Sequence, residues 1–315
     1  MRSKAGIRLI ILSFMILFLV GCVPTSIFQP SVNDIVNATI TAIPDILPMT
    51  TAEEIRIGRS IAANIAGRYG VIRDPELTRY ISLVGNTVAR KSDRPNLHYT
   101  FGVLDTDIVN AFACPGGYIL ITMGALEIID NEAELAAVLA HEVAHVAKKH
   151  IVKEIEKKKF LQVGGKIIGN YLNTDPYIFN KATLYGTNVL FKGYAKVDEY
   201  QADRLSLIYT SKAGYDPNGL LVFLEKTKAK GGVSSDPDGT NGAEIKDRTV
   251  KLLFSTHPDV NNRIDRAKRI VSRKGYDNTK GAVLEERFGR RVNPIITEYY
   301  RNYFNYNKGS DVMYK

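Results

Sequence analysis

Two short motifs constrain the fold of this 315-residue chain most strongly. They are HEVAH at residues 141–145 and EYQAD at residues 199–203. On a helix, positions four apart share a face, so His141 and His145 can direct two imidazoles at one metal ion. Glu142 lies one residue round, free to act on a water at that ion. Glu199 on a second helix can supply a third ligand, with Asp203 on the same face behind it.

The residues before the first motif favour a helix there. Asp130 and Asn131, with Glu134 placed for a capping box, can begin a helix that continues through the apolar residues 135–140. The alternative is two ordinary helix histidines beside a solvated glutamate. We disfavour it, because a charge and two imidazoles within an Ala/Val/Leu run would be costly to bury.

Five ordered segments resemble a known protein family. They are NAFACPGGY at 110–118, HEVAH at 141–145, EYQAD at 199–203, AGYDP at 213–217, and THP at 256–258 followed by Arg263-Ile264. In this order they are similar to the HtpX, BepA and LoiP type zinc metalloproteases, which are related to the CAAX prenyl endopeptidases. The resemblance extends from Thr51 to Lys274.

The resemblance implies an α+β fold, a mostly helical zincin-type metalloprotease domain with a small β-sheet beside the active-site helix. It implies one Zn²⁺ per chain, with His141, His145 and Glu199 as ligands. By the same similarity, Glu142 would be the general base and acid, and Asp203 would bind a ligand histidine.

The N-terminal residues are typical of an exported lipoprotein. Arg2, Lys4 and Arg8 precede an apolar run from Leu9 to Val20, which is too short to span a bilayer and matches a signal peptide. The run ends in LVGC at 19–22, which resembles a lipobox. We therefore expect a signal peptide over residues 1–21 and lipidation of Cys22. The alternative is a conventional signal peptide with an incidental cysteine.

Lipidation would place the mature protein on a membrane without a transmembrane helix. Each buried CH₂ of an acyl chain contributes about 0.8 kcal/mol. Val23 follows the cysteine, and in lipoproteins of diderm bacteria a residue other than aspartate there usually permits transport to the outer membrane. We expect the periplasmic face of that membrane, or another envelope membrane surface, with residues 22–50 as a tether.

The composition excludes a nucleic-acid-binding role. Loss of residues 1–21 removes three basic and no acidic residues, which lowers the formal net charge from +9 to +6. Basic residues are scattered apart from the run at 157–159, and we interpret them as a solvated surface that favours anionic lipid heads.

With Cys22 lipidated, Cys114 has no partner for an intramolecular disulfide. Cys114 replaces the apolar residue that the family often has, and we interpret it as a small core residue, not a redox switch.

Periodicity and capping residues predict six helices and two strands in a protease domain over residues 51–275. The helices are expected at Ala52–Ala66, Pro75–Lys91, Glu132–Lys159, Asp198–Lys212, Gly219–Lys228 and Asn261–Lys274, and the strands near Tyr99–Leu104 and Gly117–Thr122. Gly231–Thr240 is expected to be a mobile loop, and Gly164–Tyr194 has no clear pattern. Both are either lids over the cleft or plain surface connections. Residues 276–315 form a C-terminal extension of unknown role, without a tetratricopeptide pattern.

The stretch from Asn110 to Thr122 is a candidate substrate platform. In zinc peptidases an extended peptide commonly adds to the edge of a small sheet beside the metal. Pro115-Gly116-Gly117 suits an irregular edge. The candidate edge residues are Asn110, Ala111, Phe112 and Ala113. The alternative is a buried strand and turn that support the active-site helix, and the two roles are compatible.

Three histidines lie outside the first motif. His98 begins a strand and His150 lies more than one turn beyond the ligand face, so we expect no catalytic role for either. His257 is a candidate for two opposite roles: a regulatory fourth zinc ligand that silences the enzyme, or a hydrogen-bond donor to the oxyanion. In the third alternative it is a loop histidine that caps the following helix.

The motifs predict hydrolysis of internal peptide bonds by an exported zinc metalloendopeptidase. The resemblance implies a role in protein quality control, with misfolded or stalled envelope proteins as substrates and the outer-membrane assembly machinery as a candidate partner. A second hypothesis is a zinc-stabilised chaperone or assembly factor with latent peptidase activity, which the intact Glu142 disfavours. A housekeeping oligopeptidase would require an enclosed chamber, and the short chain argues against one.

Overall fold

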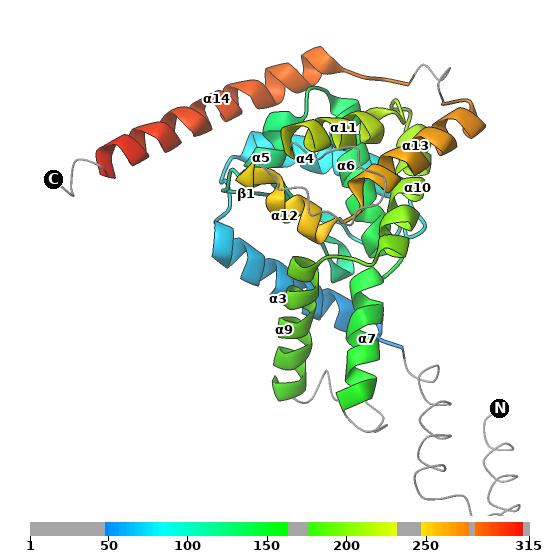
Figure 1. Ribbon diagram of the computed structural model, residues 1–315. Coiled ribbons are helices and arrows are strands. Elements are labelled where there is room, and N and C mark those ends of the chain that lie inside the picture. Colours follow the sequence, from blue (N-terminus) through cyan, green and yellow to red (C-terminus); the bar gives the residue numbers. More distant parts are fainter. Residues whose placement is uncertain (1–47, 163–175, 232–246, 277–280, 311–315) are drawn as a thin grey trace, which may run out of the picture. The chain divides into compact units, whose positions relative to one another are not determined.

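The computed structural model describes residues 48–162, 176–231, 247–276 and 281–310 (Figure 1). The expected signal peptide, Cys22 and nearly all of the expected tether lie outside these residues. No helix within the described ranges is long and apolar enough to cross a bilayer. As expected, the fold is mostly helical with a small sheet.

The sheet has three short strands in the order β1-β3-β2. They are β1 (Thr100–Leu104), β2 (Ala111–Cys114) and β3 (Tyr118–Thr122). β1 pairs parallel to β3, and β2 pairs antiparallel to β3 on its other side. The predicted strands are confirmed as β1 and β3, whereas β2 was expected only as part of an irregular edge. Because β3 is the central strand, β2 forms one edge of the described sheet.

The turn between β2 and β3 depends on glycine. It is a 3₁₀ segment, Pro115–Gly117, in which Gly116 and Gly117 have φ values of +72° and +97°. These values lie in the left-handed region that glycine favours. A Cβ on Gly58 would lie 1.7 Å from Pro115 O, so α3 (Thr51–Tyr69) packs directly against this turn.

Helix α6 (Glu132–Ala147), which carries the first motif, is buried along its whole length. Its N-cap is Asn131, whose side chain accepts a hydrogen bond from Glu134 N at 3.0 Å, while Glu134 accepts one from Asp130 N at 3.3 Å. The predicted start of this helix is therefore confirmed. α4 (Pro75–Ala89), α10 (Lys196–Lys212) and α11 (Gly219–Gly231) pack around it.

The prediction of one helix over Glu132–Lys159 is wrong. The helix ends at Ala147, and a second helix, α7 (His150–Gln162), begins after a break (Figure 1). Lys149 has a φ of +58°. Tertiary ion pairs stabilise this break, since Lys148 lies 2.5 Å from Asp93 and Lys149 lies 3.5 Å from Glu54.

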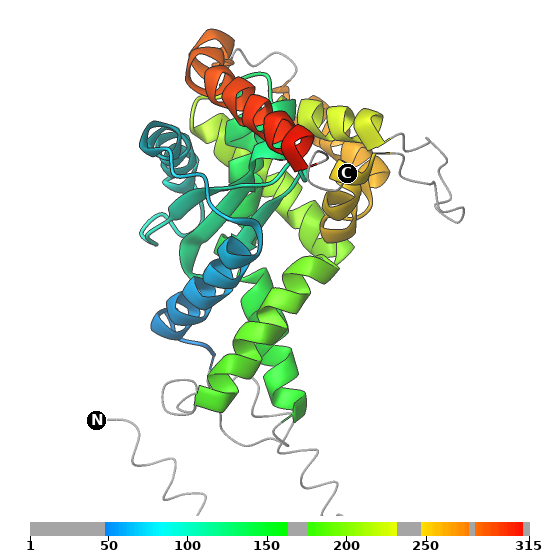
Figure 2. The ribbon, with the colours of Figure 1, turned by 90° about the vertical axis from the view of Figure 1, so that its left-hand side faces the viewer.

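The other predicted helices are confirmed with small shifts, as α3, α4, α10, α11 and α13 (Val260–Lys274). Four further helices were not predicted: α5 (Met123–Ile128), α9 (Pro176–Lys192), α12 (Arg248–Thr256) and α14 (Glu285–Ser310). α9 accounts for most of the unassigned stretch 164–194 and lies against α3 and α7 (Figure 2). Residues 164–175 of that stretch, and residues 232–240 of the expected loop, lie outside the described residues.

The C-terminal extension contributes to the core. α14 packs against α4 and α5, and its Phe288 and Val292 are fully buried in the same apolar cluster as α4 and α6. The motifs end before this helix, so they do not predict that it packs on the domain.

Candidate metal centre

Two helices supply the first three side chains of the site. α6 presents His141 and His145, and the adjoining α10 presents Glu199 from its first turn. The helices are held in register by Ser206 Oγ, which donates to Ala137 O at 2.7 Å. All three side chains are buried, with at most 4% of the residue exposed. The two motifs therefore meet as the sequence predicted.

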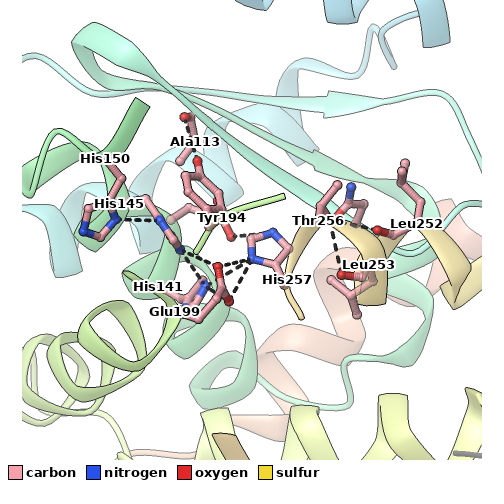
Figure 3. A network of polar contacts seen from close by, with 12 residues as sticks. Ala113, His141, His145, His150, Tyr194, Glu199, Leu252, Leu253, Thr256 and His257 are labelled. Atoms are coloured by element: carbon pink, nitrogen blue, oxygen red, sulfur yellow. Dashed lines mark hydrogen bonds and ion pairs between the residues drawn. The ribbon is translucent and has the colours of Figure 1, made fainter. Parts of the chain in front are cut away.

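The ligand atoms converge on one point (Figure 3). His145 Nε2 lies 3.0 Å from His141 Nε2 and 3.3 Å from Glu199 Oε1. His257 Nδ1 lies 3.1 Å from Glu199 Oε1 and 3.4 Å from His141 Nε2. One ligand atom from each of these four residues lies within 4.8 Å of the other three. The cluster can hold a single metal ion.

His257 joins the cluster from the end of α12. It is the C-cap residue of that helix, and it is 3% exposed. The alternative that His257 caps the following helix is wrong, because the N-cap of α13 is Asp259 and the His257 ring points into the ligand cluster (Figure 3).

A buried ion network supports the cluster from behind. Asp203 Oδ1 lies 3.0 Å from His141 Nδ1, although the angle is poor for a hydrogen bond. Arg263 binds both carboxylate oxygens of Asp203, at 2.8 and 2.7 Å, and lies 2.9 Å from Glu199 Oε2. Asp203 thus lies behind the ligand histidine His141. Arg263 belongs to the last of the five segments, but no sequence pattern indicates its role.

His150 lies against the cluster, contrary to expectation. Its Nδ1 is 2.8 Å from Nδ1 of His145, because the chain turns at Lys149 after α6 ends. Tyr194 covers the other side of His145, with ring centroids 3.8 Å apart. No sequence signal indicated Tyr194. His98 is exposed and away from the cluster, as expected.

Burial and the neighbouring charges set the protonation of the metal-free cluster. Burial lowers the pKa of His141, but Asp203 and Glu199 outweigh this effect and raise it to about 9. Burial holds the pKa of His145 well below its usual value. Burial acts to raise the pKa of Glu199, yet His257 and Arg263 bring it well below normal. The site therefore keeps an ionised carboxylate beside imidazoles, which is a donor set suited to a divalent cation.

Glu142 is buried, yet the described residues provide little hydrogen bonding for its carboxylate. Its Oε2 has no hydrogen-bond partner among the described residues, and Oε1 is 3.9 Å from His257 Nε2. Burial raises the pKa of Glu142. Its carboxylate borders an apolar pocket whose lining includes Val138, Leu220, Phe223 and Leu224. A carboxylate placed in this way is suited to take and return a proton.

The candidate substrate edge is buried by neighbouring segments. Ala111, Phe112 and Ala113 are each at most 4% exposed, and Tyr194 Oη donates to Ala113 O at 3.4 Å. Phe112 packs in the apolar cluster shared with α3 and α9, on the opposite face from Ala111 and Ala113. Asn110 accepts from Thr256 Oγ1 at 3.2 Å. Cys114 is fully buried with a raised thiol pKa caused by burial, which fits a core residue.

Comparison with known proteins identifies the family. Residues 75–271 match the profile of peptidase family M48. The chain belongs to this family. The HExxH motif, Glu199 and His257 are thus the site of an M48 metallopeptidase.

Several named proteins are distantly similar to the chain. The chain is 28% identical to the beta-barrel assembly-enhancing protease of Escherichia coli (strain K12) over 238 residues, which are 73% of this chain and 47% of that protein. It is 26% identical to the protein of that name from Yersinia pestis, over 65% of this chain and 42% of that protein. It is 26% identical to mitochondrial metalloendopeptidase OMA1 of Schizosaccharomyces pombe, over 67% of this chain and 59% of that protein. The chain therefore spans about half the length of these relatives.

Proposed function

We propose that this M48 metallopeptidase is a zinc endopeptidase of the cell envelope that degrades misfolded or stalled outer-membrane proteins. The observation that carries the proposal is the convergence of two imidazoles, a carboxylate and Glu142 in one buried site. Zinc takes nitrogen and oxygen ligands in this combination, with a further position for water or substrate. The donors fit one zinc ion per chain, with His141, His145 and Glu199 as ligands.

The chain's own residues account for the proton transfers. Bound zinc would supply Lewis-acid polarisation of the scissile carbonyl and of the attacking water. Glu142 takes the proton of that water and passes it to the leaving amine. Because burial raises the pKa of Glu142, its carboxylate is a stronger base than that of an exposed glutamate. Asp203 and Arg263 hold His141 and Glu199 in place.

β2 is the proposed substrate edge. An extended peptide would pair with the outer side of Ala111–Ala113, where backbone hydrogen bonds hold it regardless of its side chains. The Tyr194 hydroxyl now contacts Ala113 O at 3.4 Å, so a bound peptide would displace it. The same strand also supports α6, which agrees with the alternative role for this stretch.

His257 is proposed as a fourth ligand of a resting form. Its Nδ1 belongs to the cluster and would occupy the position that water or substrate needs. Displacement of His257 from this position requires only a few kcal/mol of differential binding by a substrate or partner. This observation also favours the second candidate function, an assembly factor whose peptidase activity is latent.

The effect of His257→Ala separates the two roles of this histidine. If His257 blocks the site, the variant cleaves an unfolded protein faster than wild type does. If His257 donates to the oxyanion, turnover falls while zinc content stays the same. An unchanged rate would exclude both roles.

Membrane anchoring through Cys22 is proposed from the lipobox alone. Cys22→Ser should release the protein into the soluble envelope fraction or leave its signal peptide uncleaved. A processed Cys22→Ser protein that still fractionates fully with membranes would show that another element binds them.

Degradation of an outer-membrane β-barrel protein in cells tests the substrate class. The name of the Escherichia coli relative motivates this choice. Cells whose barrel assembly is stalled should lose the unfolded protein when they produce wild-type enzyme and retain it when they produce Glu142→Gln. Equal retention with both enzymes would overturn the proposed substrate, although not the peptidase chemistry.

A further inference from the structure

A chain of polar contacts leads from the metal cluster into the protein through His145, His150 and Gln201. His145 Nε2 faces the other ligand atoms, whereas its Nδ1 lies 2.8 Å from His150 Nδ1 (Figure 3). His150 Nε2 lies 3.0 Å from Gln201 Oε1 and 3.4 Å from Asp198 Oδ1. His150 is only 2% exposed. The contacts connect both helices of the site behind one ligand.

A metal at His145 Nε2 decides where each proton of this chain lies. A neutral imidazole that gives one lone pair to a metal carries its proton on the other nitrogen. His145 Nδ1 must therefore donate, and His150 Nδ1 must accept. The proton of His150 then lies on Nε2, where the amide oxygen of Gln201 accepts it. All three groups are satisfied in one tautomeric arrangement.

The break after α6 makes this contact possible. On a continuous helix with 3.6 residues per turn, residue 150 would lie about 140° round the axis from residue 145. The left-handed conformation of Lys149 ends the helix and turns His150 back towards His145. Tyr194 stacks on the ring of His145, 3.8 Å between centroids. His150 thus contacts the edge of the His145 imidazole and Tyr194 contacts its face, so both fix the orientation of the ring.

We propose that His150 is a positioning residue that fixes the tautomer and ring orientation of His145 for zinc. Ligand histidines almost always donate their second N–H to a carboxylate, a carbonyl or water, and such partners raise ligand basicity. Asp203 Oδ1 lies 3.0 Å from the second nitrogen of His141. Beside His145, the imidazole of His150 takes the place of such a partner. The inference rests on the proposed zinc site and on no assumption about substrate or location.

Zinc affinity, measured by competition with a chromogenic chelator, tests this role directly. His150→Leu removes the acceptor and should weaken zinc binding about 10- to 100-fold, the usual effect of losing such a partner. His150→Asn keeps an acceptor oxygen near the position of Nδ1 and should recover most of the affinity. His98→Leu, the same substitution at an exposed histidine, is the control and should bind zinc like wild type.

Coupling between His150 and Gln201 separates positioning from a general loss of structure. Gln201→Leu should weaken zinc binding less than His150→Leu does. The double variant should bind no more weakly than His150→Leu alone, because Gln201 acts through His150. Additive losses would contradict this connection.

The outcomes distinguish this inference from the zinc proposal itself. A wild-type protein that binds no zinc would overturn both. Stoichiometric zinc in wild type, with equal affinity in a folded His150→Leu variant, would overturn the positioning role alone. If His150→Leu does not fold, Gln201→Leu decides: weakened zinc binding supports the role, and wild-type affinity overturns it.

Discussion

The two ends of α6 hold buried carboxylates in opposite circumstances. At the N-terminal end, Glu132 is 1% exposed and accepts hydrogen bonds from Tyr80 and Tyr215, both at 2.7 Å, and from Arg287. At the other end, Glu142 is 2% exposed and one of its oxygens has no partner among the described residues. A buried polar group normally has its hydrogen bonds satisfied. The first end is built for stability, and the second leaves a carboxylate available for chemistry.

The same contrast separates Glu132 from Glu199. Burial raises the pKa of both phenols, so Glu132 is held by two protonated phenols and a guanidinium, groups that do not readily bind a metal. Glu199 lies among His141, His145 and His257, whose ring nitrogens all can. The identity of the neighbours, not the depth of burial, therefore decides which carboxylate is functional. Three substitutions with their controls, and a pH series, can break or sharpen this comparison.

Loss of Glu199 should have the largest effect. Glu199→Ala removes a direct ligand, so it should weaken zinc binding by more than the 10- to 100-fold cost of losing an outer partner, and abolish proteolysis. Zinc content after dialysis and cleavage of an unfolded substrate measure the two effects. Glu132→Ala is the matched control at the other end of α6 and should keep its zinc. Normal zinc occupancy in Glu199→Ala would point to another third ligand.

Loss of the Glu142 carboxylate should affect chemistry alone. Glu142→Gln should lower turnover by at least about 10²-fold, the usual effect of losing a general base. Its zinc content and melting temperature should remain those of wild type, because Glu142 is not a ligand in the proposed site. Undiminished cleavage by this variant would show that the assigned mechanism is wrong.

Arg287→Met should affect stability alone. It leaves Glu132 buried with only the two tyrosines as partners, and a lost partner of a buried group costs about 1–3 kcal/mol. Because half of the Arg287 side chain is exposed, we expect the lower end of that range. Chemical denaturation measures the change, with Arg290→Met, an exposed arginine of the same helix, as the control. A zinc affinity that falls with Arg287→Met would contradict the separation of the two ends.

The smallest effect concerns acid stability. Burial acts to raise the pKa of Glu132, but hydrogen bonds from Arg287, Tyr215 and Tyr80 bring it below its usual value of 4.5. A lowered folded-state pKa gives stability that is present above about pH 4.5 and is lost as the pH falls through the folded pKa. The stability difference between wild type and Arg287→Met should therefore narrow below pH 4.5. A constant difference down to pH 3 would mean that the stability lost in Arg287→Met does not depend on the ionised Glu132 carboxylate.

The sequence predicted those parts of the site that depend on local spacing. His141, Glu142 and His145 are fixed by helical periodicity, and the family pattern pointed to Glu199 and Asp203. These residues converge as expected. Local spacing is sufficient here because one helix supplies both histidines and a second helix supplies both carboxylates.

Tertiary contacts decide the parts that the sequence did not predict. Lysine favours helices, so nothing local indicated that α6 would end before Lys149, where ion pairs to Asp93 and Glu54 stabilise a break. The position of His150 follows from that break. β2 has only four residues before Pro115, too few for a periodic signal. Arg263 and Tyr194 reach the site from segments that are distant in sequence.

Anomalous diffraction at the zinc absorption edge, from crystals of the purified protein, tests the central claim most directly. The account predicts one peak per chain, within coordination distance of His141 Nε2, His145 Nε2 and Glu199, with His257 Nδ1 as the fourth ligand of the resting form. A peak elsewhere, or a fully occupied peak that Glu199 does not coordinate, would contradict it.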